Sequence, residues 1–326
     1  MKYRTLGQTG LTVSEIGLGA FPISGMQRQE DGTRFGWTGT EDAESIALIH
    51  RCEELGINLI DSAESYGDGH SEVLTGKALR GRRDKWIVAT KVQPNAGIDS
   101  GSRDVSAVRR RVTEACELSL KRLATDYIDV YQLHAVPYEW AMPAVMDALA
   151  GLRQSGKVRW YGISTNDRQA VEKLGSFGPV HMLQVGYNLL ERSAEGFLHW
   201  AKAENIGTLI RVPLAKGQLT GKYFGARART IPENDVRYER FNKPETVDGL
   251  KRLPQLLFLQ NRTRTMAQAA LRFVLDHPAV SCVIAGAKNR RQVEDNADTA
   301  GMPPLTDAEL ERAIPIADTI GTPGWI

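Results

Sequence analysis

Short apolar runs alternate along this chain with longer segments in which apolar positions recur at helical spacing. Each run is almost continuously apolar, which is typical of strands that are buried on both faces of a parallel sheet. The pattern therefore predicts a series of strand–helix units. The eight predicted strands cover Glu15–Ala20, Ile57–Asp61, Trp86–Val92, Ile128–His134, Val158–Ser164, Met182–Gly186, Gly207–Val212 and Ser281–Gly286.

Eight helices are predicted to follow these strands, and four are preceded by residues that commonly cap a helix: Thr40, Asp104, Asn166 and Asn289. The eight units average about 36 residues, close to the size of a βαβ unit. Eight such units that close on themselves form an α/β fold, the (β/α)8 TIM barrel, which is the fold class we expect. The predicted helices cover residues 42–55, 71–80, 104–123, 139–155, 167–175, 194–204, 264–276 and 290–299.

Three additions extend this pattern. Residues Lys2–Val13 predict an N-terminal β-hairpin that closes the bottom of the barrel. The polar stretch Lys216–Pro244 predicts a long loop after strand 7, and the segment from Pro303 to about Asp318 predicts a C-terminal helix. No repeat or linker divides the chain, so residues 1–326 are expected to form a single domain. An open doubly wound sheet is disfavoured because no Gly-x-Gly-x-x-Gly turn follows the first strand.

Composition and charge narrow the possible partners. The 326 residues include 41 Lys and Arg against 39 Asp and Glu, a balance that disfavours binding to nucleic acid or to a membrane surface. The N-terminal residues lack the apolar run of a signal peptide. Cys52, Cys116 and Cys282 lie in apolar segments at no disulfide or metal spacing, so we expect buried, reduced thiols. A cytoplasmic protein is expected, as a monomer or weak homo-oligomer.

Four chemically active residues lie at or just beyond the ends of neighbouring predicted strands: Asp61 and Tyr66, Lys91, and His134. Taken singly, each has an ordinary explanation as a cap, a rim salt bridge or a packed side chain. In a closed barrel, however, the carboxyl ends of the strands meet at one face, which is where catalytic residues collect. Together the four residues predict one shared polar site.

These residue types suggest proton donation. A lysine ammonium beside a tyrosine lowers the pKa of the phenol, and Asp61 would hold Lys91 in place and keep it protonated. A neutral His134 could orient a carbonyl oxygen. No nucleophile–base pair is evident for acyl transfer, and no metal-ligand spacing occurs, so no metal site is expected. A proton donor without an electrophile needs a partner for the other half of the reaction, and hydride from a nicotinamide fits.

A second region of interest is the basic turn that follows the last predicted strand. Lys288, Arg290 and Arg291 place three cations where that strand turns through Gly286 into a helix. The start of a helix at this corner of a barrel often binds phosphate. The turn therefore predicts a site for a phosphomonoester such as the 2′-phosphate of NADP, although an ordinary solvated basic turn is the alternative.

These same residues resemble the motifs of the aldo-keto reductase superfamily, and the resemblance covers nearly the whole chain. The segment from Asp61 to Tyr66-Gly is similar to the family's Asp-Thr-Ala-x-x-Tyr-Gly signature. Ile87–Lys91 resembles its lysine strand, and Asp126–His134 resembles its histidine strand. Gly156–Ser164 and Pro213–Gly221 are similar to further family blocks. The resemblance implies a barrel, NADPH-dependent carbonyl reduction, and a tetrad of these four residues with the tyrosine as acid.

The resemblance also implies a set of cofactor-binding residues. Ser164, Thr165 and Gln184 would hold the nicotinamide carboxamide. The cofactor would be bordered by Arg211, near the end of strand 7, and by the turn that follows it, at Pro213, Leu214 and Gly217. Four residues would face the adenosine phosphate: Gly286, Lys288, Gln292 and Asn296. The chain departs from many members in having Arg211 in place of an aromatic residue that stacks on nicotinamide, and Gly286 in place of a lysine that pairs with the 2′-phosphate.

The sequence thus predicts an NADPH-dependent oxidoreductase that reduces a small-molecule carbonyl substrate, an aldehyde or ketone, with NADH as a possible cofactor. Two alternatives stay open. One is an NADP-binding regulatory subunit like the barrel subunits of potassium channels, and the other is an NAD(P)-linked sugar or polyol dehydrogenase. Phe21, Trp37 and Tyr223 are candidate walls of the substrate pocket, with ordinary packing as the alternative.

Overall fold

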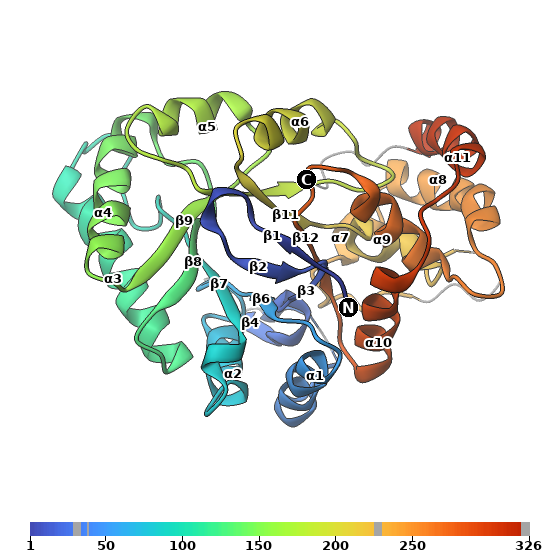
Figure 1. Ribbon diagram of the computed structural model, residues 1–326, viewed down its shortest axis with the longest axis horizontal. Helices are drawn as coiled ribbons and strands as arrows, with labels where there is room; N and C mark the ends of the chain where they lie inside the picture. Colours follow the sequence, from blue (N-terminus) through green and yellow to red (C-terminus); the bar gives the residue numbers. More distant parts are fainter. Residues whose placement is uncertain (29–33, 38, 225–229, 321–326) are drawn as a thin grey trace.

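Eight parallel strands close into a barrel in this computed structural model, which describes residues 1–28, 34–37, 39–224 and 230–320 (Figure 1). The strands neighbour one another in the order β10-β11-β12-β3-β6-β7-β8-β9, so the predicted (β/α)8 fold is confirmed. They are β3 (Ile16–Gly19), β6 (Leu59–Asp61), β7 (Ile87–Val92), β8 (Ile128–Leu133), β9 (Val158–Ser164), β10 (Met182–Gly186), β11 (Gly207–Arg211) and β12 (Cys282–Gly286).

Helices form a ring around the barrel, and their apolar faces pack on the outer faces of the strands (Figure 1). The principal helices are α1 (Asp42–Glu54), α2 (His70–Ala78), α3 (Val105–Leu123), α4 (Met142–Gln154), α5 (Arg168–Gly175), α6 (Glu195–Ala203), α9 (Met266–Asp276) and α10 (Arg290–Asp298). All eight were expected from the sequence, within a few residues at either end. The C-terminal helix is present as well, as α11 (Asp307–Ile320).

Two of the four predicted helix caps are confirmed and two are wrong. The side chains of Asp104 and Asn289 accept hydrogen bonds from backbone N–H groups in the first turns of α3 and α10. Helix α1 is instead preceded by Glu41, and the cap of α5 is Asp167. Asn166 does not cap α5 because its amide bonds both backbone groups of Gly186, at 2.9 and 2.8 Å.

The predicted N-terminal hairpin is formed by β1 (Tyr3–Thr5) and β2 (Thr12–Ser14), which pair antiparallel and cross one end of the barrel in Figure 1. Leu6, Leu11 and Val13 are buried in one cluster with apolar side chains from the barrel strands, among them Leu59 and Leu209. The hairpin therefore closes the amino-terminal end of the barrel with apolar contacts, as expected, and leaves the other end for chemistry.

The long segment after β11 is not the plain loop that its polar composition suggests. It contains a 3-10 helix (Ala215–Thr220) and the short helix α7 (Tyr238–Phe241), and α8 (Pro244–Arg252) and a second 3-10 helix (Leu253–Leu259) follow. The loop after β3 holds a small hairpin, β4 (Met26–Arg28) with β5 (Arg34–Gly36), which was also not predicted. These short elements carry too few periodic positions to stand out in the sequence. Residues 29–33 and 225–229 of the two predicted loops lie outside the described part of the chain.

The three cysteines are free and buried, as the sequence predicted. Burial raises the pKa of the Cys52 thiol to about 12, which makes it an inert packing residue. Among the helices of the described residues, none combines the length and apolar character needed to cross a bilayer.

Candidate active site

The inside of the barrel is divided into an apolar lower layer and a polar upper layer. Successive residues of a strand point to opposite faces, so residues two apart point the same way. The lower layer is an apolar cluster that points inward and packs against the N-terminal hairpin. It includes Leu59, Ala89, Val130, Met182 and Leu209. The residue two positions further along each of these strands therefore also points inward, toward the carboxyl end. This set is Asp61, Lys91, Gln132, Gln184 and Arg211.

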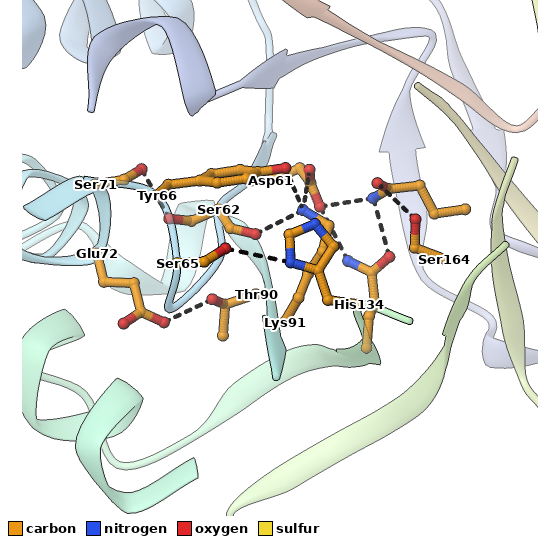
Figure 2. A network of polar contacts seen from close by, with 12 residues as sticks. Asp61, Ser62, Ser65, Tyr66, Ser71, Glu72, Thr90, Lys91, His134 and Ser164 are labelled. Carbon is orange, nitrogen blue, oxygen red and sulfur yellow. Dashed lines mark hydrogen bonds and ion pairs between the residues drawn. The ribbon is translucent and has the colours of Figure 1, made fainter. Parts of the chain in front are cut away.

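Lys91 lies at the centre of the polar layer, fully buried at the end of β7. Its Nζ donates to Asp61 Oδ2 at 2.6 Å, to the backbone carbonyl of Ser62 at 2.7 Å and to the Tyr66 hydroxyl at 3.2 Å. Figure 2 shows this ammonium between the three acceptors. All three N–H donors of Lys91 are thus used, and one of them is fixed on the tyrosine oxygen.

The second oxygen of Asp61 is also held in place. Oδ1 accepts hydrogen bonds from the side-chain amides of Gln132 and Gln184, both at 2.9 Å. Gln184 in turn donates to Gln132 Oε1 at 3.0 Å. The buried carboxylate is therefore satisfied on both oxygens, which is the condition under which a buried ion pair is tolerated.

Burial and the neighbouring charges set the protonation of Lys91 and Tyr66. Burial lowers the pKa of Lys91, but Asp61 and Tyr66 together outweigh it, so the pKa of Lys91 is raised and the ammonium persists, as predicted. Burial raises the pKa of Tyr66, and the nearby Lys91 ammonium opposes this increase without reversing it. The expected lowering of the phenol pKa is therefore wrong in sign. Tyr66 is therefore protonated at neutral pH, and its hydroxyl accepts a hydrogen bond from the Lys91 ammonium.

His134 follows β8 and its ring meets the ring of Tyr66 edge-on, with centroids 5.6 Å apart. Ser65 Oγ lies 3.4 Å from its Nδ1. Burial, assisted by the charges of Lys91 and Arg211, lowers the pKa of His134 to about 3. The imidazole is therefore neutral at physiological pH, in agreement with the role expected from the sequence.

Aromatic rings from the loop after β3 border Tyr66. Phe21 lies on Tyr66 with ring centroids 4.7 Å apart, and Trp37 meets Phe21 edge-on at 5.8 Å. The contacts of Tyr223 are with other residues. Its ring packs against Phe241 at 5.1 Å and its hydroxyl accepts a hydrogen bond from Arg237.

The three residues expected to hold the nicotinamide carboxamide lie side by side at the ends of β9 and β10. Ser164 and Thr165 are buried, and Ser164 Oγ lies 3.4 Å from Gln184 Oε1. The Thr165 hydroxyl accepts a hydrogen bond from the N–H of Asp167 at the start of α5. Gln184 bonds Asp61, so this cluster is continuous with the polar layer around Lys91.

Arg211 ends β11 and enters the barrel mouth. Its Nη2 lies at a long 3.4 Å from Asn166 Oδ1, and its buried Nε has no hydrogen-bond partner among the described residues. The chain then turns sharply, since Val212 has a φ of 57°, a left-handed conformation that a β-branched residue rarely adopts. Such strain typically persists where a ligand site demands it. Pro213 is buried behind this turn, and Leu214 and Gly217 lie partly exposed along it.

The basic turn after β12 is arranged differently from the prediction. Arg290 and Arg291 do not join Lys288, because they pair along α10 with Glu294 and Asp295 at 3.1 and 3.9 Å. Their side chains are 68% and 89% exposed. Of the other residues expected here, Gly286 is exposed at the end of β12 and Asn296 is buried. Gln292 is turned back, with its Oε1 accepting from the Lys288 N–H at 2.8 Å.

Lys288 instead faces a residue cluster from the two long loops. Its Nζ lies 4.7 Å from the centroid of the Trp37 ring, and the Arg237 guanidinium lies 4.3 Å from the same ring. Asp235 holds Arg237 with two hydrogen bonds and lies 4.0 Å from Lys288. A backbone hydrogen bond of 2.9 Å from Val236 to the carbonyl of Gly36 joins the two loops. Both loops thus meet over the carboxyl end of the barrel.

Two lysines of this region have pKa values well below the ordinary value for lysine. Burial lowers the pKa of Lys288 to about 8, with a contribution from the Arg237 charge. Burial likewise lowers the pKa of Lys216 to about 8, with contributions from Arg240 and Arg211. Partly buried cations that repel one another form a natural receptor for a polyanion. The chemistry of this donor set, together with the unpartnered Nε of Arg211, fits a phosphate-bearing dinucleotide.

Three residues whose side chains can bind a metal lie close together, away from this site. Glu195 and His199 on α6 approach His277 at the end of α9, and Glu195 also accepts a hydrogen bond from Tyr187. The Nδ1 of His277 accepts the N–H of Ala279 at 3.2 Å. The ring proton of neutral His277 therefore resides on Nε2, the nitrogen that faces Glu195. Glu195 Oε1 lies 3.1 Å from this nitrogen without hydrogen-bond geometry, so the two side chains make an electrostatic contact. A metal would need a lone pair at the same nitrogen.

Sequence reasoning missed several residues of the site. Gln132 points inward two residues after Val130, a position that strand periodicity can identify once the lower layer is known. The carbonyl of Ser62 gives no sequence signal, because every residue carries one. Asn166 was interpreted only as a helix cap, and Arg237 only as part of a basic loop. Both act through contacts between segments far apart in the sequence.

A model of the Aldo/keto reductase family matches residues 15–315. The chain is 33% identical to the aldo-keto reductase YhdN of Bacillus subtilis (strain 168), over 99% of this chain and 96% of that protein. The match therefore includes all eight barrel strands and both long loops.

Solved structures give the same result in three dimensions. The glycerol dehydrogenase AKR11B4 from Gluconobacter oxydans is 30% identical, with a TM-score of 0.78 over 96% of this chain and 94% of that chain. An aldo/keto reductase from Klebsiella pneumoniae, solved with NADP and acetate, is 25% identical, with a TM-score of 0.69 over 96% of this chain and 94% of that chain. The similarity extends over the strands that carry the candidate site.

Proposed function

Since this chain belongs to the aldo/keto reductase family, an NAD(P)H-dependent class of oxidoreductase, we propose that it reduces aldehyde or ketone groups of small molecules with NADPH. The observation that carries the proposal is the hydrogen-bonded series from Asp61 through Lys91 to the hydroxyl of Tyr66. A protonated phenol beside a fixed ammonium can deliver a proton to an oxyanion that develops next to it.

Each member of the tetrad has a separate task in this proposal. Tyr66 donates its proton to the carbonyl oxygen of the substrate, while Lys91 stabilises the resulting phenolate. Asp61 keeps Lys91 charged and oriented. Neutral His134 donates one hydrogen bond that positions the carbonyl oxygen, without adding a charge to the site. The nicotinamide, when bound, supplies the hydride.

The cofactor would be held by residues from both halves of the barrel. We assign the carboxamide to Ser164, Thr165 and Gln184, in keeping with their position beside Asp61. The turn from Arg211 through Pro213 and Leu214 to Gly217 would border the cofactor. Lys216 and Lys288, whose pKa values are lowered to about 8, would bind its phosphate groups. Gly286, Gln292 and Asn296 would surround the adenosine end.

The proposal is tested with a panel of neutral and charged aldehydes and ketones, each mixed with the protein and NADPH. We expect multiple turnovers, followed by the loss of NADPH absorbance, on reactive aldehydes such as 4-nitrobenzaldehyde. A protein that binds NADPH but turns over once and slowly on every compound would contradict a reductase function. That outcome would instead favour an NADP-binding regulatory subunit.

A second candidate function, oxidation of sugars or polyols, is favoured by the similarity to a glycerol dehydrogenase. The same residues can run the reaction backwards, because Tyr66 as phenolate accepts a proton from an alcohol by microscopic reversibility. The two directions are separated by comparing kcat/KM for NADPH with an aldehyde against that for NADP⁺ with glycerol or an aldose. A higher value in the oxidative direction at neutral pH would make dehydrogenation the main activity.

A further inference from the structure

The polar upper layer of the barrel carries one more positive charge than negative charge. Among the described residues that point inward at this level, Asp61 is an anion, and Lys91 and Arg211 are cations. Tyr66 and His134, which border the same space, are neutral. Asp61 is fully engaged with Lys91 and the two glutamine amides. The charge of Arg211 is therefore uncompensated.

The position of Arg211 directs its charge into the interior of the barrel, where few groups can screen it. It lies two residues beyond Leu209 on β11, so its side chain enters the barrel interior above the apolar layer. Its one hydrogen-bond contact, to Asn166, is a neutral amide oxygen at 3.4 Å, and its Nε is buried without a partner. Within the described part of the chain no carboxylate pairs with it. Since a guanidinium stays protonated under all ordinary conditions, the field is permanent.

The strand order places this charge within the reactive part of the mouth. β11 lies across the barrel from β7, the strand of Lys91, so the two cations face the enclosed space from opposite sides. The charge of Arg211 is felt by both Tyr66 and His134. The reacting ring of a bound nicotinamide must lie in this same space, next to the proton donor.

The two redox forms of the cofactor differ by one charge at that ring. The oxidised nicotinamide is a cation and the dihydronicotinamide is neutral, whereas the phosphate groups are the same in both. A fixed positive charge in a low-dielectric mouth therefore disfavours the oxidised form alone. A neutral aromatic residue at position 211 would exert no such force.

We propose that Arg211 selects the reduced cofactor, so that the protein binds NADPH more tightly than NADP⁺. The inference rests on the proposed function, since it requires the nicotinamide to lie beside Tyr66. NADPH then occupies the site in the presence of NADP⁺, and NADP⁺ leaves readily after each turnover. The same positive field stabilises negative charge on the substrate oxygen.

Equilibrium binding tests the proposal without any substrate. Dissociation constants for NADPH and NADP⁺ are measured by quenching of intrinsic tryptophan fluorescence for the wild type, Arg211→Met and Arg211→Lys. We expect the ratio of the NADP⁺ constant to the NADPH constant to fall by about tenfold in Arg211→Met, the size of a moderately screened charge interaction. Arg211→Lys should retain most of the ratio, because it keeps the charge.

Lys288→Met is the matched control for loss of a cation. Lys288 lies at the end of the site assigned to the phosphates, which are common to both redox forms. This variant should weaken NADPH and NADP⁺ by similar factors and leave their ratio unchanged. An unchanged ratio in Arg211→Met, with both forms still bound and the fold intact by circular dichroism, would overturn the proposal.

Two further outcomes separate this inference from others. If the ratio is unchanged but KM rises at least tenfold for 4-carboxybenzaldehyde and not for 4-nitrobenzaldehyde, Arg211 binds a substrate anion and the proposal is wrong. If the wild type binds neither NADPH nor NADP⁺, the proposed function fails first. If the wild type binds both and turns over, a failure of the ratio test concerns Arg211 alone.

Discussion

Two corners of the barrel mouth differ in how fully their charged groups are paired. At the corner formed by β6 and β7, the ammonium of Lys91 makes three hydrogen bonds and both oxygens of Asp61 have partners. At the corner formed by β11 and β12, Arg211 lacks a counter-ion among the described residues. Lys216 and Lys288 there have pKa values of about 8.

The difference indicates that the two corners have separate roles. The first corner is complete without any ligand, so its geometry is fixed before a substrate arrives, as preorganised proton transfer requires. At the second corner, Lys216 and Lys288 form a cationic site to which a phosphate-bearing ligand can bind. Chemistry and cofactor affinity should therefore respond to different mutations, and each prediction below tests one side of this division.

The largest effects are expected at the complete corner. Lys91→Met leaves the Asp61 carboxylate buried without its counter-ion, which should lower the free energy of unfolding by about 3–5 kcal/mol. The rate of carbonyl reduction should fall by about 10²–10⁴, because Tyr66 loses the cation that stabilises its phenolate. Denaturant unfolding and steady-state kinetics measure the two effects.

A double variant separates stability from catalysis at this corner. Asp61→Asn combined with Lys91→Met removes both charges, so much of the lost stability should return. Activity should not return, since no cation remains beside Tyr66. Recovery of activity together with stability would mean that the pair serves only the fold.

A pH effect is expected at the other corner. Lys216 and Lys288 are deprotonated above about pH 8 in the free protein, and a bound phosphate should raise their pKa values again. NADPH binding must then take up protons, so its dissociation constant should be flat below pH 7 and rise by up to about tenfold per pH unit and per lysine above pH 8. Calorimetry in two buffers of different ionisation enthalpy measures the uptake. Constant affinity up to pH 9.5 would contradict this account of the corner.

A smaller effect is expected for discrimination between the two dinucleotides. Lys288→Met should reduce the preference for NADPH over NADH by about tenfold, because one charge-assisted contact to the 2′-phosphate is lost. Arg290→Met is the control, since Arg290 pairs with Glu294 and should leave the preference unchanged. If Arg290→Met has the larger effect, the phosphate lies over α10 rather than beside the loops.

The sequence was most informative where a signal is local. The barrel strands follow from apolar runs, and Asp61, Lys91 and His134 follow from the ends of those runs. Tyr66 comes from the loop next to Asp61, and the structure places its hydroxyl 3.2 Å from Lys91. Strand periodicity accounts for this success, because it fixes both which residues are buried and where each strand ends.

The sequence was least informative where the outcome depends on competing long-range effects. The pKa of Tyr66 is raised because burial exceeds the influence of Lys91, and burial cannot be quantified from a motif. Arg290 and Arg291 stand beside Lys288 in the sequence, yet helical spacing gives each an acidic partner four residues on. The contact of Lys288 with Trp37 and Asp235 joins three distant segments and has no local signature.

The central claim is that the corner of Tyr66 carries the chemistry and the opposite corner carries the cofactor. The most direct test is to measure, for Tyr66→Phe, both the NADPH dissociation constant and the rate of NADPH oxidation with 4-nitrobenzaldehyde. Tyr131→Phe is the matched control, because it removes a buried hydroxyl that has no partner among the described residues. The account predicts wild-type affinity and a rate lowered by about 10²–10⁴ for Tyr66→Phe, with little change in either quantity for the control. A wild-type rate in Tyr66→Phe would contradict it.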